Sequence, residues 1–322
     1  MGIGFTGELT FNEMIQQVEV CEKAGFDSAW VAEDYFLRDA VSVAAAFAAV
    51  TRNIKIGIGV INPYTRNPAL TAMTVAALDE ISKGRLIFGI GTGVKSIQER
   101  IGIGVGKRLL AIRETIEVLR KFLRRENVEY HGQIVNIDSV RLGFHPLREE
   151  VPIYMAAVGP KMLQLAGELA DGVLLTAGCS PKYVTTAKKN IRIGAEKTGR
   201  DPSSIDVACY IICSVSDSSD KAFEAARPLV GLTISPPEYG KLVLEETGLD
   251  PSLLDRIGQV PTDDEGIRRL SRVVTDEMVD ALSASGTPER FRKKLDEYMS
   301  SGVDLPIITP VGSCFNKVIS SL

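Results

Sequence analysis

Residues 54–91 read IKIGIGVINPYTRNPALTAMTVAALDEISKGRLIFGIG, and this stretch decides the fold. It opens with an apolar run at Ile54–Val60 and closes with a second one at Arg85–Ile90. Between them, Pro68 begins a predicted helix that reaches about Ile81, and Gly84 ends it. Two short apolar runs joined by one helix are typical of a βαβ unit with parallel strands.

The same alternation of short strands and longer helices continues on both sides of this unit. Further strands are expected at Ile3–Phe5, Ser28–Ala32, Ile153–Ala156, Val173–Thr176, Ile205–Val215 and Leu305–Thr309. Further helices are expected at Thr10–Ala24, Asp39–Val50, Lys107–Arg124, Pro160–Ala170, Pro181–Lys197 and Thr287–Ser300. Eight strands in 322 residues predict an α/β fold, a (β/α)8 TIM barrel in one domain over residues 1–322. An open doubly wound sheet is the alternative, because its topological switch point is not visible in a sequence.

Two segments interrupt this rhythm. Residues 127–143 alternate in polarity around Gly132, which predicts a β-hairpin insertion. Residues 217–282 are helical and polar in places, which predicts a helical insertion before the last barrel unit.

The charge balance and hydropathy exclude several classes of partner. The chain is 45% hydrophobic and 24% charged, with a net charge of −4, and its pI is near 5.5. Such a mild acidic balance gives no reason to expect nucleic acid or an anionic membrane as a partner. There is no run of eighteen or more apolar residues and no basic, apolar leader, so we expect a cytoplasmic protein.

Cysteine and histidine usage argues against disulfides and metal. The five cysteines are scattered and odd in number, which is typical of reduced thiols. With two histidines and no cluster of histidine, cysteine and carboxylate, we expect no metal site.

In a barrel of this kind, function lies at the carboxyl ends of the strands. Glu33 and Asp34 are the acids found at such an end, after the second strand. Since neighbouring residues on a strand point to opposite sides, at most one of them faces the barrel mouth if the strand continues. Either one acid handles a proton, or both are solvated loop charges or partners of Arg38.

The other strand ends are rich in glycine and hydroxyl groups. Glycine lets the backbone approach a flat or phosphorylated ligand, and a helix N-terminus favours an anion. Gly159 and Pro160 open the helix after the fifth strand, so this N-terminus is a phosphate candidate, or simply a helix start. GIGTG at 89–93 lacks the spacing of a dinucleotide fingerprint and is interpreted as a cofactor-contacting loop or a tight turn.

Several longer stretches resemble one family. ALTAMTVAALDEISKGRLIFGIGTG at 69–93 and GPKMLQLAGELADGVLL at 159–175 resemble the bacterial luciferase-like superfamily. GVINPYTRNPALTA at 59–72, ERIGI at 99–103 and VTDEM at 274–278 resemble, more narrowly, the F420-dependent 5,10-methylenetetrahydromethanopterin reductases of archaea. The similarity extends from about residue 2 to 312.

This resemblance implies a TIM barrel that forms a homodimer or homotetramer and holds coenzyme F420, or alternatively FMN, across the strand ends. It implies a cis peptide bond between Gly59 and Val60 that presses on the cofactor ring. It places the phosphate of the cofactor tail at 157–159. The expected cofactor-binding residues are Gly59, Val60, Asn62, Thr92, Gly93, Ala157, Val158, Gly159 and Thr176.

The sequence departs from the family at three acidic positions. Where the reductases carry a glutamate on strand one, this chain has Gly4; an Asp-His pair becomes Glu33-Asp34, and an acid after the fourth strand becomes Val94. Breaking the carbon–nitrogen bond of a methylene bridge calls for an acid. We therefore expect Glu33 or Asp34 to be catalytic, with Glu8 as a further substitute.

The predicted function is F420-dependent hydride transfer to a small, tetrahydropterin-like substrate, with reduction of 5,10-methylenetetrahydromethanopterin to the methyl form as the first choice. An FMN-dependent luciferase-like monooxygenase and a non-catalytic cofactor-binding paralogue are the alternatives.

Overall fold

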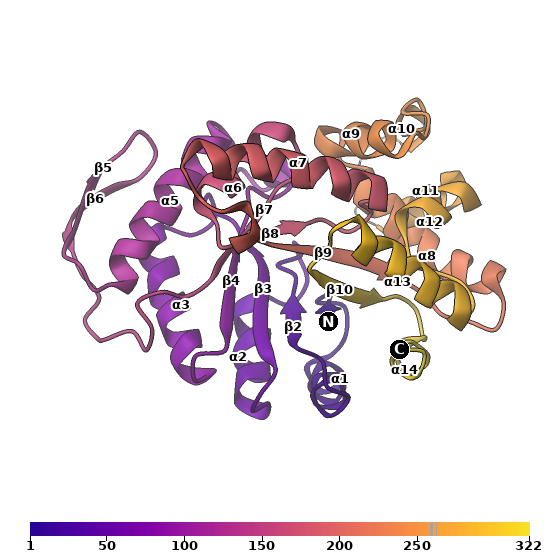
Figure 1. The fold of residues 1–322 in the computed structure, drawn as a ribbon, viewed down its shortest axis with the longest axis horizontal. Coiled ribbons are helices and arrows are strands. Elements are labelled where there is room, and N and C mark those ends of the chain that lie inside the picture. Colours follow the sequence, from indigo (N-terminus) through magenta and orange to yellow (C-terminus); the bar gives the residue numbers. More distant parts are fainter. Residues whose placement is uncertain (258–259, 262) are drawn as a thin grey trace.

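Eight parallel strands close a barrel in the order β1-β10-β9-β8-β7-β4-β3-β2, as the sequence predicts (Figure 1). The computed structural model describes residues 1–257, 260–261 and 263–322, with the backbone alone at 238–239. The barrel strands are β1 (Gly2–Phe5), β2 (Ser28–Val31), β3 (Lys55–Ile61), β4 (Leu86–Ile90), β7 (Ile153–Ala156), β8 (Gly172–Leu175), β9 (Asp206–Cys213) and β10 (Leu305–Pro310). The closed order excludes the open doubly wound sheet.

Helices follow the strands and cover the outside of the barrel (Figure 1). They include α1 (Phe11–Lys23), α2 (Ala40–Val50), α3 (Pro68–Ile81), α5 (Arg108–Leu123), α6 (Pro160–Leu169), α7 (Pro181–Lys197) and α13 (Pro288–Ser301). Their starts follow from local capping. Thr10 caps α1 in a box with Glu13, and the Asp39 side chain accepts from Ser42 at the start of α2.

Both predicted insertions have the secondary structure expected of them. β5 (Val128–His131) and β6 (Asn136–Val140) form an antiparallel hairpin that projects from one end of the molecule (Figure 1). The helical segment comprises α8 (Ser219–Ile234), α9 (Pro237–Thr247), α10 (Leu253–Ile257), α11 (Asp264–Val273) and α12 (Asp276–Leu282). Residues 258, 259 and 262 of this segment lie outside the described residues.

Three short helices were not predicted, and several element ends differ by one or two residues. α4 (Lys95–Arg100) follows β4, α14 (Phe315–Ser320) follows β10, and the short 3-10 helix η1 (Pro202–Ser204) precedes β9. One-turn helices leave too few residues for a periodic pattern to stand out. None of the helices in the described part of the chain is long and apolar enough to cross a membrane.

Aromatic side chains fill the barrel interior, and each lies against glycine. Trp30 packs over Gly57, where an added Cβ would come within 2.2 Å of the indole. Tyr154 packs over Gly172 in the same way, at 2.5 Å. The Trp30 and Tyr154 rings are 5.5 Å apart between centroids. Each glycine is the register partner of the aromatic residue on the neighbouring strand and makes room for its ring, as close packing of a core requires.

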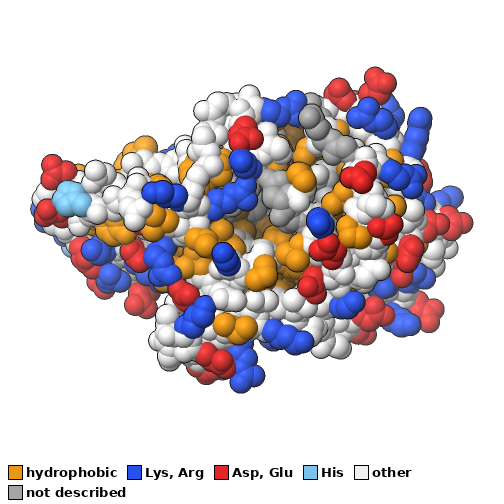
Figure 2. Space-filling view, turned by 90° about the horizontal axis from the view of Figure 1, so that it is seen from above, with side chains coloured by type: hydrophobic (Ala, Val, Ile, Leu, Met, Phe, Trp, Pro, Cys, Tyr) orange, Lys and Arg blue, Asp and Glu red, His pale blue; other side chains and the backbone are white. Residues whose placement is uncertain are grey.

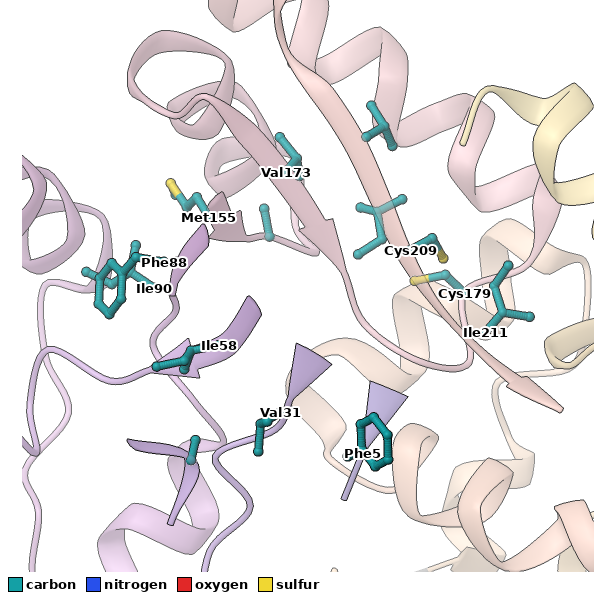
Figure 3. Packing of buried hydrophobic residues seen from close by; sticks show 14 of the residues in the cluster. Phe5, Val31, Ile58, Phe88, Ile90, Met155, Val173, Cys179, Cys209 and Ile211 are labelled. Carbon is teal, nitrogen blue, oxygen red and sulfur yellow. The ribbon is translucent and has the colours of Figure 1, made fainter. Parts of the chain in front are cut away.

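The opposite faces of the strands pack against the helices. Phe88, Met155, Val173 and Cys209 lie in this layer (Figure 3). All five cysteines are buried and unbonded to one another, as expected.

Candidate active site

The predicted cofactor residues of β3 and β4 meet at the carboxyl end of the barrel. The Gly59-Val60 peptide bond is cis, as the resemblance implied. The register between β3 and β4 shifts here, between Ile58 and Ile61. A Cβ on Gly91 would lie 2.6 Å from Val60 Cγ2 and 2.8 Å from the Ala156 side chain. Glycine at 91 thus lets β3, β4 and β7 converge under this bond.

Tyr210 of β9 forms the floor of this region. Its hydroxyl donates to the Gly59 carbonyl at 3.4 Å. Its ring meets the Trp30 ring edge-on at 6.5 Å between centroids. Gly4 and Thr309 lie beside it, because a Cβ on Gly4 would come 2.7 Å from Thr309 Oγ1 and 3.3 Å from the Tyr210 ring. Sequence reasoning missed Tyr210, since one tyrosine in the apolar run CYIIC resembles ordinary core.

The two predicted catalytic acids have different surroundings. Glu33 Oε2 accepts the Ala40 backbone N–H at 2.6 Å, so this side chain holds the start of α2. The Asp34 side chain has no hydrogen-bond or ion-pair partner among the described residues, and the residue is exposed to solvent. Even so, desolvation by the dense surrounding protein raises its pKa to about 6, and the charges of Glu8 and Glu33 add to the shift. Arg38 pairs with neither acid and donates to the Gly7 carbonyl at 2.9 Å.

Asp34 and Tyr210 are electrostatically coupled across the mouth. Burial raises the pKa of the Tyr210 phenol, and the Asp34 carboxylate raises it further. The Tyr210 phenol thus donates to the Gly59 carbonyl at the cis bond and is exposed to the charge of Asp34.

The predicted phosphate segment lies at the start of α6. Gly159 is the N-cap, and no side chain caps the helix there. The Tyr183 hydroxyl donates to the Val158 carbonyl and fixes the segment from α7. A Cβ on Gly159 would meet no atom within 4 Å, so the space over this helix start is open. Ala157 is buried and Val158 and Thr176 are half-buried.

A groove of about 330 Å³ lies between α5 and α6, with Lys161 of the first turn of α6 in its lining. Its other basic side chains have partners in the same groove, because Arg113 pairs with Glu168 and Lys197 donates to Gln164. The face above the barrel is hollowed near its centre, with lysine, arginine and hydrophobic side chains around the hollow (Figure 2). This end of the molecule therefore offers positive charge to an anionic ligand.

A compact polar cluster joins the loops after β2, β3 and β4. Asn62 Nδ2 donates to Tyr35 Oη at 3.1 Å and to the Thr92 carbonyl at 3.2 Å. Gln98 Nε2 donates to the same two oxygens, at 2.7 Å each. Gly93, with φ of 65°, lies against all three side chains, and a Cβ there would come within 2.8 Å of each.

This cluster contains the predicted residues Asn62, Thr92 and Gly93, but Tyr35 and Gln98 were missed. Gln98 lies on the short helix α4, and its burial gives no signal in sequence. Tyr35 directly follows the predicted acids and could have been suspected on that ground alone. In the described parts of the chain, no group of three or more histidine, cysteine or acidic side chains is arranged to hold a metal ion.

Comparison with known proteins places these features in a family. The luciferase-like monooxygenase family matches residues 3–305. The 5,10-methylenetetrahydromethanopterin reductase of Archaeoglobus fulgidus is 39% identical, covering 99% of this chain and 96% of that protein. The reductase of Methanolobus tindarius is 37% identical over 99% of this chain and 96% of its own.

A solved structure has the same fold over the whole chain. The coenzyme F420-dependent tetrahydromethanopterin reductase of Methanopyrus kandleri superimposes with a TM-score of 0.88 and 30% identity, covering 100% of this chain and 96% of that one. An F420-dependent secondary alcohol dehydrogenase, 23% identical with a TM-score of 0.82, shares the fold. From the family match and these full-length relatives, the chain belongs to the luciferase-like monooxygenase family, alongside the methylenetetrahydromethanopterin reductases.

Proposed function

We propose that this protein is an F420-dependent oxidoreductase that reduces a tetrahydropterin-type substrate at the carboxyl end of the barrel, with 5,10-methylenetetrahydromethanopterin as the first choice. Full-length relatives with this activity, 39% and 37% identical, carry the proposal. The Methanopyrus structure supports the choice of F420, since its protein is named as F420-dependent and its fold matches throughout.

The residues at the mouth suit such a cofactor. Gly59 and Val60 are half-buried at the mouth, where a flat ring would pack against the Val60 side chain. The uncapped start of α6 at Gly159 suits a phosphate, because helix N-terminal N–H groups favour anions. Asn62, Thr92, Gly93, Ala157, Val158 and Thr176 complete the proposed contacts. When bound, F420 supplies or accepts the hydride, and the protein supplies position and proton handling.

Asp34 is the residue to which we assign the proton. Hydride addition to the methylene carbon breaks one of its two carbon–nitrogen bonds, and the departing nitrogen takes up a proton. A carboxyl with a pKa near 6 holds a proton on a useful fraction of molecules at neutral pH. Glu33, the other predicted acid, is assigned a supporting role, because it already accepts the Ala40 N–H.

An anaerobic assay with reduced F420 and methylenetetrahydromethanopterin tests this assignment. We expect Asp34→Asn to lower kcat by about 100-fold or more, the usual contribution of a general acid. The F420 Kd should stay within about threefold, because the acid serves the substrate, and Asp34→Glu should recover part of the activity. Turnover of Asp34→Asn within threefold of the parent would contradict the role of Asp34.

We further propose that the protein self-associates through α2 and α3. Leu70, Met73 and Ile81 are 48%, 49% and 46% exposed and recur along one stripe of α3. Neighbouring α2 reads AVSVAAAFAAV and carries no charge. Exposed apolar side chains that recur on adjoining helices are typical of an association site. A second copy presenting the same face would bury both stripes in a two-fold interface.

A second candidate function is that of an FMN-dependent oxygenase, because the family to which the chain belongs is described as luciferase-like monooxygenases. Cofactor preference separates it from the F420 enzyme. A non-catalytic cofactor-binding paralogue would bind F420 without turnover in the assay above.

A further inference from the structure

Tyr35 is the centre of the polar cluster beside the proposed cofactor site. Its hydroxyl oxygen receives two hydrogen bonds, from Asn62 Nδ2 at 3.1 Å and from Gln98 Nε2 at 2.7 Å. Both amides also donate to the Thr92 carbonyl. Two amide groups therefore bridge the same two oxygen atoms.

Chemistry fixes the direction of these bonds. The Thr92 carbonyl can only accept, so the amide atoms that face it must be nitrogens. The Tyr64 backbone N–H donates to Asn62 Oδ1 at 2.7 Å, which independently orients that amide. Each amide nitrogen carries two hydrogens, and both are used in this arrangement.

It follows that the Tyr35 hydroxyl acts here as an acceptor twice. Both of its lone pairs are occupied, so its own proton must be donated elsewhere. No described residue accepts that proton. The ring is half-buried and fixed by the two amides, so the donor is held in place rather than free to rotate away. Accepting two bonds also polarises the O–H and makes it a stronger donor.

We propose that the Tyr35 hydroxyl is a cofactor-binding donor whose proton goes to a carbonyl or anionic oxygen of the ring bound at the mouth. The proposal rests on the proposed F420 function, because a deazaflavin ring carries such oxygens at its edge. Residues on either side of the cluster support the location: Asn62 follows the cis bond, and Gly93 leaves no side chain between the cluster and the mouth.

Gln98 and Asn62 are then positioning residues that act through Tyr35. Gln98 is fully buried, and its Oε1 has no hydrogen-bond partner in the structure. Leaving a buried acceptor unpaired is unfavourable, because the group loses its bonds to water and gains none in the protein. In the orientation that leaves Oε1 without a partner, Nε2 donates to both Tyr35 and Thr92. The unsatisfied acceptor therefore indicates that these two donated bonds determine the orientation of the amide.

The test compares Tyr35→Phe with Tyr64→Phe by titration with F420, following its absorbance and fluorescence. Tyr64 lies nearby, but its hydroxyl already donates to the Gly106 carbonyl at 2.6 Å and serves only the protein. We expect Tyr35→Phe to raise the F420 Kd by about 3- to 10-fold, as one lost hydrogen bond predicts. The absorption shift of the bound ring should shrink as well. Tyr64→Phe should leave the Kd and the shift unchanged.

Three results would overturn the proposal while leaving the F420 function intact. In the first, folded Tyr35→Phe binds F420 with parent affinity and an unchanged spectrum. In the second, it raises the substrate KM alone, which would place the acceptor oxygen on the substrate. In the third, both phenylalanine variants weaken binding equally. Failure of the parent protein to bind F420 at all would instead contradict the proposed function. Thermal unfolding of both variants identifies any loss of binding that comes from misfolding.

Discussion

Gly4 lies directly against the Tyr210 ring. A Cβ at position 4 would stand 3.3 Å from Tyr210 Cδ1 and Cε1 and 2.7 Å from Thr309 Oγ1. The space beside this strand-one position, where the resemblance anticipates a glutamate, is therefore filled by an aromatic ring of β9, which lies two strands away around the barrel. An acidic side chain at position 4 would therefore collide with this ring, and Asp34 is the acid whose charge acts on the Tyr210 phenol.

A side chain at position 4 should therefore destabilise the fold. We expect Gly4→Ala to lower the free energy of unfolding by about 1–3 kcal/mol, the usual cost of overpacking. Urea unfolding measures this change, with Gly104→Ala as the control, because no atom lies within 4 Å of a Cβ there. Equal effects of the two substitutions would show that Gly4 is not packed as described. By the same reasoning, Gly4→Glu should not restore a strand-one acid.

The raised pKa of Asp34 predicts a pH-dependent stability. Its pKa in the folded protein is about 6, above the ordinary 3.8, so folding disfavours the ionised carboxylate. The resulting loss of folding stability is absent below about pH 4, grows as the pH rises from about 4 to about 6, and is complete above about pH 6. Asp34→Asn should therefore raise the melting temperature at pH 7.5 and raise it less at pH 5. A gain that is the same at both pH values would argue against the raised pKa.

Glu114 should hold the hairpin insertion to α5. Its carboxylate accepts backbone N–H groups of Gln133, Ile134 and Val135 at 2.9, 2.9 and 2.8 Å. Burial opposes its ionisation, but these three donors outweigh it and lower the pKa below 4.5. The stabilisation is thus present above about pH 4.5 and is lost as the pH falls through the lower folded value.

We expect Glu114→Gln to cost about 1–3 kcal/mol at pH 7 and less at pH 4, since it weakens charge-assisted bonds. Hydrogen exchange at 133–135 should speed up in the variant. Unchanged protection there would mean that the hairpin does not depend on this carboxylate.

The apolar stripe on α3 predicts self-association. Met73→Glu places a charge at a residue that is 49% exposed, where a monomer would tolerate it. Light scattering should report a lower mass for this variant than for the parent, with the fold retained by circular dichroism. The same substitution at Met299, which is 52% exposed on α13, serves as the control. A parent that already scatters as a monomer would contradict the interface.

The sequence predicts the barrel because its signals are local and periodic. Thr10 with Glu13, Asp39 and Ser180 all cap helices where the chain predicts them to begin. The six residues of α4 carry no such period and were missed. The cis bond at Gly59 came from the resemblance, since no local rule predicts it.

Individual site residues could be proposed from the sequence, but the contacts among them could not. Asn62, Thr92 and Gly93 were expected near the cofactor, yet nothing in the sequence links them to Tyr35 or Gln98. Tyr35 is 27 residues from Asn62 in the chain, and Gln98 is 6 residues from Thr92. Likewise, only the folded barrel shows that Glu33 turns to α2 while Asp34 stays unpaired. The different surroundings of these two adjacent acids depend on where the loop after β2 turns, and that depends on tertiary structure.

The most direct test of the account is a titration of the purified protein with F420 and, separately, with FMN. An F420-dependent enzyme should bind F420 saturably, with a Kd at least about tenfold below that for FMN, a difference of about 1.4 kcal/mol. A preference for FMN, or binding of neither cofactor, would contradict the proposed function.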